Sequence, residues 1–241
     1  MNIIQSTILS RYPDLVFGMS TRDDSAASGF NLSFKVGDDT VSVQKNRTAF
    51  FTMLNISEER IAFPQQEHSN TVAICNQPQK IPSCDGLITA EKDLFLAVTI
   101  ADCTPVMMYD TKRQVVAGVH AGWRGTTTHI VGNTIMMMRS VYKTDPADIV
   151  AFIGPSAGVC CYEVGLDVAV SLPPACVTPK SDGKFFVDIK RANLLQLVEY
   201  GVRESHIEVN SDCSIHNHAY HSHRRDGSRS GRMLAVIGIK K

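Results

Sequence analysis

Between residues 71 and 119 the sequence contains five short apolar runs in close succession, and this stretch constrains the fold more than any other. The runs cover residues 71–74, 86–89, 94–100, 105–109 and 115–119, and Asp, Gly, Pro or Lys residues bound them. Runs of this length with such boundaries predict β-strands. Because the strands follow one another directly, we expect mixed α+β layers and not a regular βαβ array.

The rest of the chain adds helices on either side of these strands. Helices are predicted at residues 40–54, after the turn residues at 37–39, and at residues 126–142. A third runs from its N-cap Asp188 to Tyr200, with Gly201 at its C-terminal end. Further strands are expected at 149–153, 207–209 and 233–239. With no internal repeat, low-complexity tract or charged linker, residues 1–241 are predicted to form a single domain.

Charge and cysteine content exclude several classes of protein. Lys plus Arg and Asp plus Glu both number 24, so zero net charge offers no long-range attraction to nucleic acid or a membrane surface. No run approaches 18 apolar residues and no signal peptide is visible, so we expect a soluble, cytoplasmic protein. The seven cysteines form no CxxC pair, which argues against a zinc ribbon and favours mostly buried free thiols.

Three segments carry candidate chemistry. In VVAGVHAGWRG (residues 115–125) a strand ends at His120, and a glycine-rich turn with Arg124 leads towards a predicted helix whose first N–H groups could bind an anion. Cys103 lies between two apolar strands beside Asp102, and His68 lies in a polar loop before residue 71. Taken singly, each also fits a plain structural role, as a buried thiol or a loop histidine.

Taken together, TIADCTPVMMYD, HAGWRG and QQEHSN are similar to the three signature motifs of the bacterial YfiH family. This family is also called the laccase-domain or multicopper polyphenol-oxidase family, and a purine nucleoside phosphorylase family. The resemblance covers nearly the whole chain, including IGP with YEVG at residues 153–165 and RRDG with GRM at residues 224–233. It implies a layered α/β/β/α sandwich of the YfiH-like type.

The resemblance also implies a metal site and an activity. The family binds zinc through residues that match His68, Cys103 and His120, which leaves a fourth tetrahedral position open; copper could also bind. The activities implied are phosphorolysis of adenosine, inosine and methylthioadenosine, and adenosine deamination. A purine nucleoside and phosphate are the expected partners. Cys103 and His120, with Asp85 and Asp102, are the candidate catalytic residues.

Phosphorolysis requires positive charge for the phosphate. The candidate phosphate-binding residues are Arg22, Arg47, Arg124 and Arg225. Two departures from the family pattern stand out: Glu67 replaces an aliphatic residue beside His68, and residues 216–223 contain four histidines. On an extended segment His216 and His218 would share one face, which allows a second metal site, although a polar loop is the simpler interpretation.

Other functions remain compatible with these motifs. The same scaffold could carry a cytoplasmic hydrolase that edits peptidoglycan precursors, and in a metal-free form Cys103 would be a thiolate nucleophile activated by His120. A copper-dependent polyphenol oxidase is a third option, although ordinary laccase clusters need many more histidine ligands. A binding module whose metal only stabilises the fold is the non-enzyme alternative.

Overall fold

Two six-stranded sheets form the centre of the molecule in a computed structural model, which describes residues 2–241. The first sheet has the strand order β1-β2-β15-β7-β3-β5. In this order its strands are Ile3–Ile4, Leu15–Ser20, Met233–Ile239, Phe95–Ile100, Ile61–Pro64 and Lys80–Ile81. Most neighbours are antiparallel, whereas β3 runs parallel to both β7 and β5.

The second sheet has the order β14-β10-β8-β9-β6-β4. Its strands are Ile207–Val209, Ile149–Ile153, Thr104–Asp110, Val115–Ala121, Gly86–Thr89 and Val72–Ile74. Every residue of β8, β9 and β10 is buried, because both faces of these strands are covered. One face packs on the first sheet, where Met107 and Val116 share a core cluster with Leu96 and Ile237.

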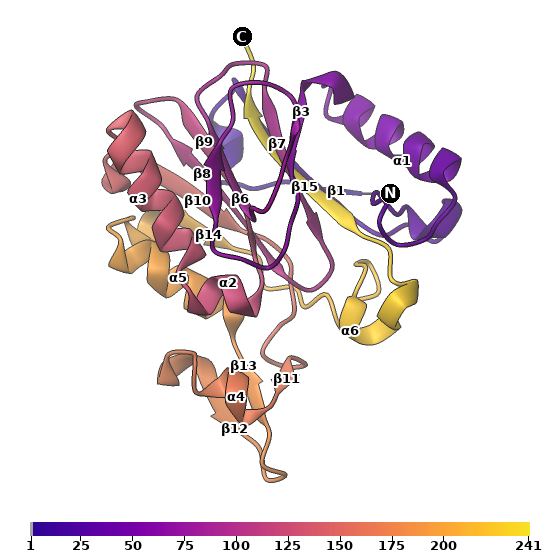
Figure 1. Cartoon of the computed structure of the whole chain (residues 1–241), viewed down its shortest axis with the longest axis vertical. Coiled ribbons are helices and arrows are strands. Elements are labelled where there is room, and N and C mark those ends of the chain that lie inside the picture. Colours follow the sequence, from indigo (N-terminus) through magenta and orange to yellow (C-terminus); the bar gives the residue numbers. More distant parts are fainter. Residues whose placement is uncertain (1) are drawn as a thin grey trace.

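Helices cover the outer faces of both sheets (Figure 1). Helix α1 (Thr40–Met53) packs Phe50 and Phe51 against strands β7 and β15 of the first sheet. Helices α3 (Ile130–Tyr142) and α5 (Ile189–Glu199) cover the second sheet. The order of layers is therefore helix, sheet, sheet, helix, which confirms the predicted α+β class and the α/β/β/α sandwich.

A small third sheet projects from one end of the sandwich, at the bottom of Figure 1. It consists of β11 (Glu163–Val164), β13 (Phe185–Val187) and β12 (Val177–Pro179), with helix α4 (Leu166–Ala169) beside it. Its own apolar cluster also packs against Trp123 and Tyr162. The sequence did not predict this subdomain, because its strands have only two or three residues and lack a clear apolar period.

The predicted strands and helices agree closely with the structure, with one correction. The helix expected at residues 126–142 is divided into α2 (Trp123–Thr127) and α3, because His129 adopts a left-handed backbone conformation with φ 61°. The helical segment therefore begins at Trp123, directly after the glycine-rich turn. The Asp188 cap is confirmed, since its side chain accepts a hydrogen bond from the Arg191 N–H.

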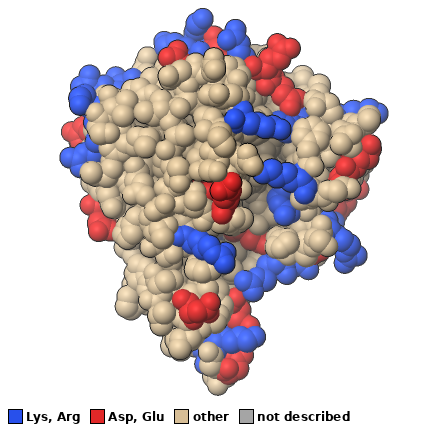
Figure 2. Space-filling view, in the orientation of Figure 1, with Lys and Arg blue, Asp and Glu red and all other residues tan. Residues whose placement is uncertain are grey.

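We propose that residues 2–241 form one domain, as the sequence predicted, because both sheets contribute to one core cluster. None of the helices in this part of the chain combines the length and apolarity that a membrane crossing needs. On the face shown in Figure 2, Lys and Arg side chains gather around α6 (His223–Asp226), with acidic side chains interspersed.

Two methionines on helix α3 provide a matched test of this packing. Met138 is fully buried against the second sheet, whereas Met136 is 50% exposed. We expect Met138→Ala to lower the free energy of unfolding by about 2–5 kcal/mol, because it leaves a cavity in the core. Met136→Ala should change it by less than about 0.5 kcal/mol. Urea denaturation of both variants measures the difference, and similar losses would contradict the assigned helix face.

Candidate metal centre

Three side chains that are far apart in the sequence converge at the end of the sandwich near α2. His68 lies in the loop between β3 and β4, Cys103 lies in the turn between β7 and β8, and His120 lies near the end of β9. One nitrogen of each imidazole and the Cys103 Sγ lie within 4.8 Å of one another. His120 is buried, Cys103 is half-buried, and His68 is exposed.

The pairing of β8 with β9 brings Cys103 and His120 together. In this antiparallel hairpin Pro105 pairs with His120 and Thr104 pairs with Ala121. Cys103 immediately precedes the paired segment, so its side chain lies beside the end of β9. The two imidazole rings of His68 and His120 meet edge to face, with 5.0 Å between their centroids.

Asp85 holds both histidines in position. Its buried carboxylate accepts hydrogen bonds from the backbone N–H groups of Glu67, His68 and Ser69. It also lies 2.8 Å from the Nδ1 of His120. Because Nδ1 is engaged in this way, Nε2 is the His120 atom left to face the Cys103 thiol. Asp85, which the sequence suggested as a catalytic residue, therefore contacts the two histidines in the folded chain.

Three residues of this group have pKa values that are shifted far from their ordinary values. Burial alone would raise the pKa of Asp85, but the hydrogen bonds from His120 and Ser69 lower it well below its ordinary value. Burial also opposes ionisation of Cys103, yet the two neighbouring imidazoles lower the pKa of the thiol to about 6. The pKa of His120 is raised to about 9, because Cys103 and Asp85 outweigh the effect of burial. A Cys103 thiolate facing a protonated His120 imidazolium is thus the favoured state near neutral pH.

Two glycines of the HAGWRG segment are required by this close packing. A Cβ at Gly122 would lie 3.1 Å from the Cys103 Sγ and 3.1 Å from the Cδ2 of His68. A Cβ at Gly125 would lie 2.8 Å from the carbonyl oxygen of Ser69. Any larger residue at these positions would push the three ligand-bearing segments apart.

The donor set fits a metal ion. A thiolate and two imidazoles are ligands that zinc and copper accept, and three protein ligands leave one position for a substrate or water. The Asp85 carboxylate accepts a hydrogen bond from the far nitrogen of His120, and a carboxylate is a usual partner of a metal-binding histidine. The three side chains are therefore placed so that they could hold a metal ion with one position left open.

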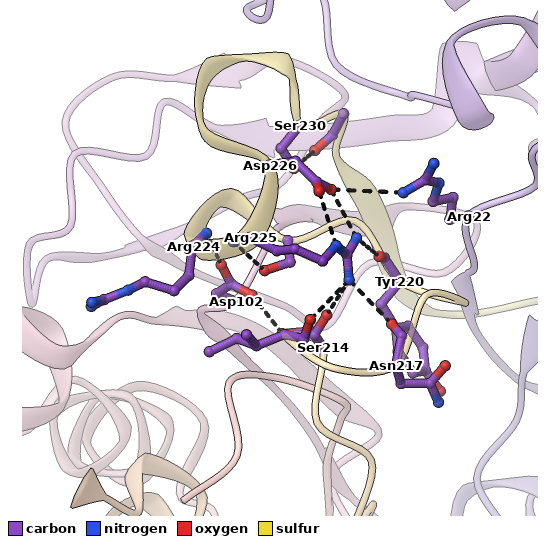
Figure 3. A network of polar contacts seen from close by, with 12 residues as sticks. Arg22, Asp102, Ser214, Asn217, Tyr220, Arg224, Arg225, Asp226 and Ser230 are labelled. Atoms are coloured by element: carbon purple, nitrogen blue, oxygen red, sulfur yellow. Dashed lines mark hydrogen bonds and ion pairs between the residues drawn. The ribbon is translucent and has the colours of Figure 1, made fainter. Parts of the chain in front are cut away.

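Asp102, the other suggested catalytic carboxylate, is held by three segments (Figure 3). Its Oδ1 accepts a hydrogen bond from the Ser214 hydroxyl at 2.6 Å, and its Oδ2 accepts one from the Arg224 N–H at 2.6 Å. Its carbonyl accepts the Ala157 N–H. Asp102 has φ 82°, which is rare for a residue with a Cβ. These contacts hold the turn that presents Cys103.

The four arginines suggested for phosphate binding lie in different surroundings. Arg22 pairs with Asp24 at 2.6 Å, and Arg47 pairs with Glu58 at 2.7 Å among three phenylalanine rings. Arg225 pairs with Asp226 and also donates to the backbone carbonyls of Ser214, Ile215 and Tyr220 (Figure 3). Only Arg124, exposed over the Trp123 ring at 4.4 Å, belongs to the segment that carries His120.

Sequence reasoning missed three residues beside the metal centre. Tyr162, Arg224 and Trp123 line a pocket of about 300 Å³. Burial, and then the nearby Cys103, raise the pKa of Tyr162 to about 12, and the Arg224 guanidinium lies 5.2 Å from its ring centre. Arg232 is close enough to Asp102 and Cys103 to interact with their charges. The segments YEVG, RRDG and GRM mark these positions, but their roles depend on the fold.

The histidine-rich segment at 216–223 is a loop with turns, as the simpler interpretation had it, and not the extended segment on which His216 and His218 would share one face. His216 lies 3.4 Å from the Cys160 Sγ and 3.5 Å from the Cys161 Sγ. His221 is buried against Gly29 and Gly231 instead. Glu67, the other departure, lies in an exposed loop and accepts a hydrogen bond from Ser83.

Comparison with known proteins identifies close relatives. The family model for multi-copper polyphenol oxidoreductase laccase matches residues 16–240. The chain is 31% identical to a purine nucleoside phosphorylase of Bacteroides thetaiotaomicron, over 97% of this chain and 94% of the relative. It is 35% identical to purine nucleoside phosphorylase YlmD of Geobacillus stearothermophilus, over 94% of this chain and 90% of the relative. The crystal structure of YlmD from the latter species superposes with a TM-score of 0.90 at 33% identity, covering 98% of this chain and 94% of that one.

Replacing the Asp85 carboxylate should weaken metal binding without removing a ligand. We expect Asp85→Asn to lower the affinity for Zn²⁺ by about 10- to 100-fold, because the shared acceptor loses its negative charge and its second oxygen. Competition with a chromophoric chelator measures the affinity, and circular dichroism confirms the fold. Glu67→Gln is the matched control, since that carboxylate contacts Ser83. Equal affinities for the two variants would show that Asp85 does not support the centre.

The buried His221 should make stability depend on pH. Burial and the nearby Arg22 and Arg232 lower its pKa from 6.5 to about 4, although Asp226 and a hydrogen bond to the Gly29 backbone oppose this. Arg22, Gly29 and Asp226 line a pocket with it, as do Ser28, Asp38 and Arg229. Because the folded pKa is the lower one, the unfolded chain takes up the proton first as the pH falls.

We therefore expect up to about 3 kcal/mol of stability to be lost as the pH falls from 6.5 towards 4. The His221→Gln variant lacks this titration, so its stability should fall less steeply over the same interval. Urea denaturation at several pH values compares the two proteins. Parallel pH profiles for wild type and variant would contradict the assignment.

Proposed function

This chain belongs to the multi-copper polyphenol oxidoreductase laccase family, and we propose that it is a zinc-dependent purine nucleoside phosphorylase. The observation that carries the proposal is the pocket of Trp123, Tyr162 and Arg224 beside the three-ligand centre. It offers aromatic rings to a purine and positive charge to phosphate. The relatives named above, which carry the name purine nucleoside phosphorylase, support the same activity.

In this proposal His68, Cys103 and His120 hold the metal. A bound zinc ion supplies a positive charge that stabilises developing negative charge and lowers the pKa of a coordinated water. Copper is the alternative occupant of the same donor set. Asp85 fixes the imidazole of His120 and the backbone of the loop that carries His68, and Asp102 fixes the turn that carries Cys103. We assign these two carboxylates positioning roles.

The pocket residues bind the two substrates. Phosphate replaces the base at C1′ of the ribose, so that a C–O bond forms as the C–N glycosidic bond breaks, and the free purine leaves. Arg224 of the pocket and Arg124, which lies over the ring of Trp123, are both exposed and can hold the phosphate through charge-assisted hydrogen bonds. Trp123 and Tyr162 can stack on the purine ring. The internal ion pairs of Arg47 and Arg225 favour structural roles for these two side chains.

We propose adenosine, inosine and methylthioadenosine as substrates, and adenosine deamination as a second activity of the same site. The paired Cys103 and His120 favour one competing function, a metal-independent thiol hydrolase acting on peptidoglycan precursors. Polyphenol oxidation ranks lower, because a three-ligand centre offers fewer histidines than a multicopper cluster needs.

Product analysis distinguishes these functions. The zinc-loaded protein is incubated with adenosine or inosine, with and without phosphate, and ribose 1-phosphate, free base and ammonia are quantified. We expect base release that requires phosphate and yields equal amounts of ribose 1-phosphate, with ammonia formed from adenosine. No base release from any nucleoside, together with amino-acid release from a UDP-muramyl peptide, would overturn the proposal.

Arg124 provides a residue-level test of the phosphate site. We expect Arg124→Ala to raise the KM for phosphate by about 10- to 100-fold, since one charge-assisted hydrogen bond is worth about 1.5–3 kcal/mol. The KM for the nucleoside should change less. Arg139→Ala removes the same charge from the exposed surface of α3 and is the control. Equal effects of both variants would exclude a phosphate contact by Arg124.

A further inference from the structure

A second group of metal-binding side chains lies outside the centre described above. The Sγ atoms of Cys160, Cys161 and Cys213 and a ring nitrogen of His216 all lie within 4.8 Å of one another. The His216 Nδ1 is 3.4 Å from the Cys160 Sγ and 3.5 Å from the Cys161 Sγ. The sequence predicted mostly buried free thiols, and the cysteines are indeed free, with four of the seven buried. The prediction did not foresee that three of them gather around one imidazole.

The group joins two segments that are about fifty residues apart in the chain. Ser156 and Cys213 form a parallel β-bridge, and the Ser214 N–H donates to the Ser156 carbonyl at 2.9 Å. One segment therefore supplies Cys160 and Cys161, and the other supplies Cys213 and His216. A pair of ligands separated by two residues, like Cys213 and His216, is a common unit of structural zinc sites.

The backbone around Cys213 is arranged to receive a thiolate. The Gly158 N–H donates to the Cys213 Sγ at 3.2 Å. The backbone N–H groups of Ile215 and His216 are near enough to help lower the pKa of this thiol, although burial opposes the shift. Several N–H donors converging on one sulfur stabilise its negative charge, which is the form that binds a metal. A buried neutral thiol would not need such an arrangement.

Gly158 makes the approach of the sulfurs possible. A Cβ at this position would lie 2.8 Å from the Cys213 Cβ, 3.2 Å from its Sγ and 3.3 Å from the Cys160 Sγ. Position 158 therefore requires glycine, because any side chain there would collide with Cys213 where the two segments meet. Cys160 and His216 are exposed, so a metal ion has a direct path into the group.

We propose that Cys160, Cys161, Cys213 and His216 form a second metal site, structural and specific for Zn²⁺. Three thiolates and one imidazole complete a tetrahedral shell, which leaves no position for substrate. This closed set contrasts with the open set of His68, Cys103 and His120. The second site therefore stabilises the fold and takes no part in the chemical reaction.

A short chain of hydrogen bonds connects the second site to the turn that carries Cys103. Ser214, which follows Cys213, donates its hydroxyl to Asp102, the residue before Cys103. Arg225 holds the same turn by donating to the carbonyls of Ser214 and Ile215 (Figure 3). A metal that fixes the turn at 213–216 thereby fixes the side chain that positions Asp102.

Metal counting on the reduced, zinc-reconstituted protein tests the proposal without any activity assay. We expect two zinc ions per chain in the wild type, and one in Cys103→Ser and in Cys161→Ser. Cys176→Ser, which changes a buried cysteine outside both groups, should retain two. A wild type that holds one zinc ion, lost entirely in Cys103→Ser, would overturn the proposal.

Co²⁺ absorption spectra and Tm measurements provide independent tests in case one variant folds poorly. Loaded with Co²⁺, Cys103→Ser should show the intense near-ultraviolet thiolate bands of a tetrahedral three-sulfur site, and Cys160→Ser and His216→Ala should weaken or shift them. The Tm of Cys103→Ser should fall on chelation and recover with Zn²⁺. Absence of thiolate bands in Cys103→Ser, or failure of these three cysteines to take up zinc after any disulfide among them has been reduced, would contradict a metal site.

Discussion

The antiparallel register of β8 with β9 is the constraint on which the rest of the structure depends. These two strands lie at the centre of the second sheet and are buried along their whole length. The pairing of Thr104 with Ala121 places the residues just beyond it, Cys103 and the glycine-rich turn, at one end of the sandwich. A slip by one residue would turn the apolar side chains of both strands to opposite faces and would separate Cys103 from His120. Core packing and metal-ligand geometry are thus determined by one set of backbone hydrogen bonds.

Asp85 connects the buried second sheet to the loop that carries His68. It precedes β6, the neighbour of β9, and its carboxylate is removed from solvent. A buried carboxylate is unfavourable unless it is well hydrogen-bonded, and here the His68 loop supplies backbone donors and His120 supplies a ring nitrogen. Each of these donors would lose its partner if the loop moved. Moving the His68 loop would leave the buried Asp85 carboxylate with fewer hydrogen bonds, which is unfavourable. Asp85 therefore helps to keep His68 near Cys103 and His120.

Sequence patterns predicted most of the sandwich because its strands are apolar, bounded by turn residues and adjacent in the chain. The strands at 86–89, 149–153, 207–209 and 233–239 agree with the structure residue for residue. The break at His129 could not be predicted, because a left-handed conformation at a histidine has no Gly or Pro to signal it. The three proposed metal ligands came from resemblance to a family, since an isolated Cys and two His carry no spacing signal. The internal role of Arg225 was invisible, because its acceptors are backbone carbonyls that only the folded turn brings together.

The group of Cys160, Cys161, Cys213 and His216 contains a sequence signal that a search for CxxC pairs does not detect. A search for CxxC pairs passes over Cys213 and His216, although a CxxH pair has the same spacing and the same ligand chemistry. Its partners, Cys160 and Cys161, could be recognised only after the bridge between Ser156 and Cys213 had been formed. The strained Asp102 lies between the two groups, with its carbonyl bound to Ala157 of one segment and its carboxylate bound to Ser214 of the other. A backbone conformation of this kind persists only where its surroundings over-determine it. The two segments that bear the cysteines are those surroundings, so the geometry at Cys103 depends on how firmly they are held together.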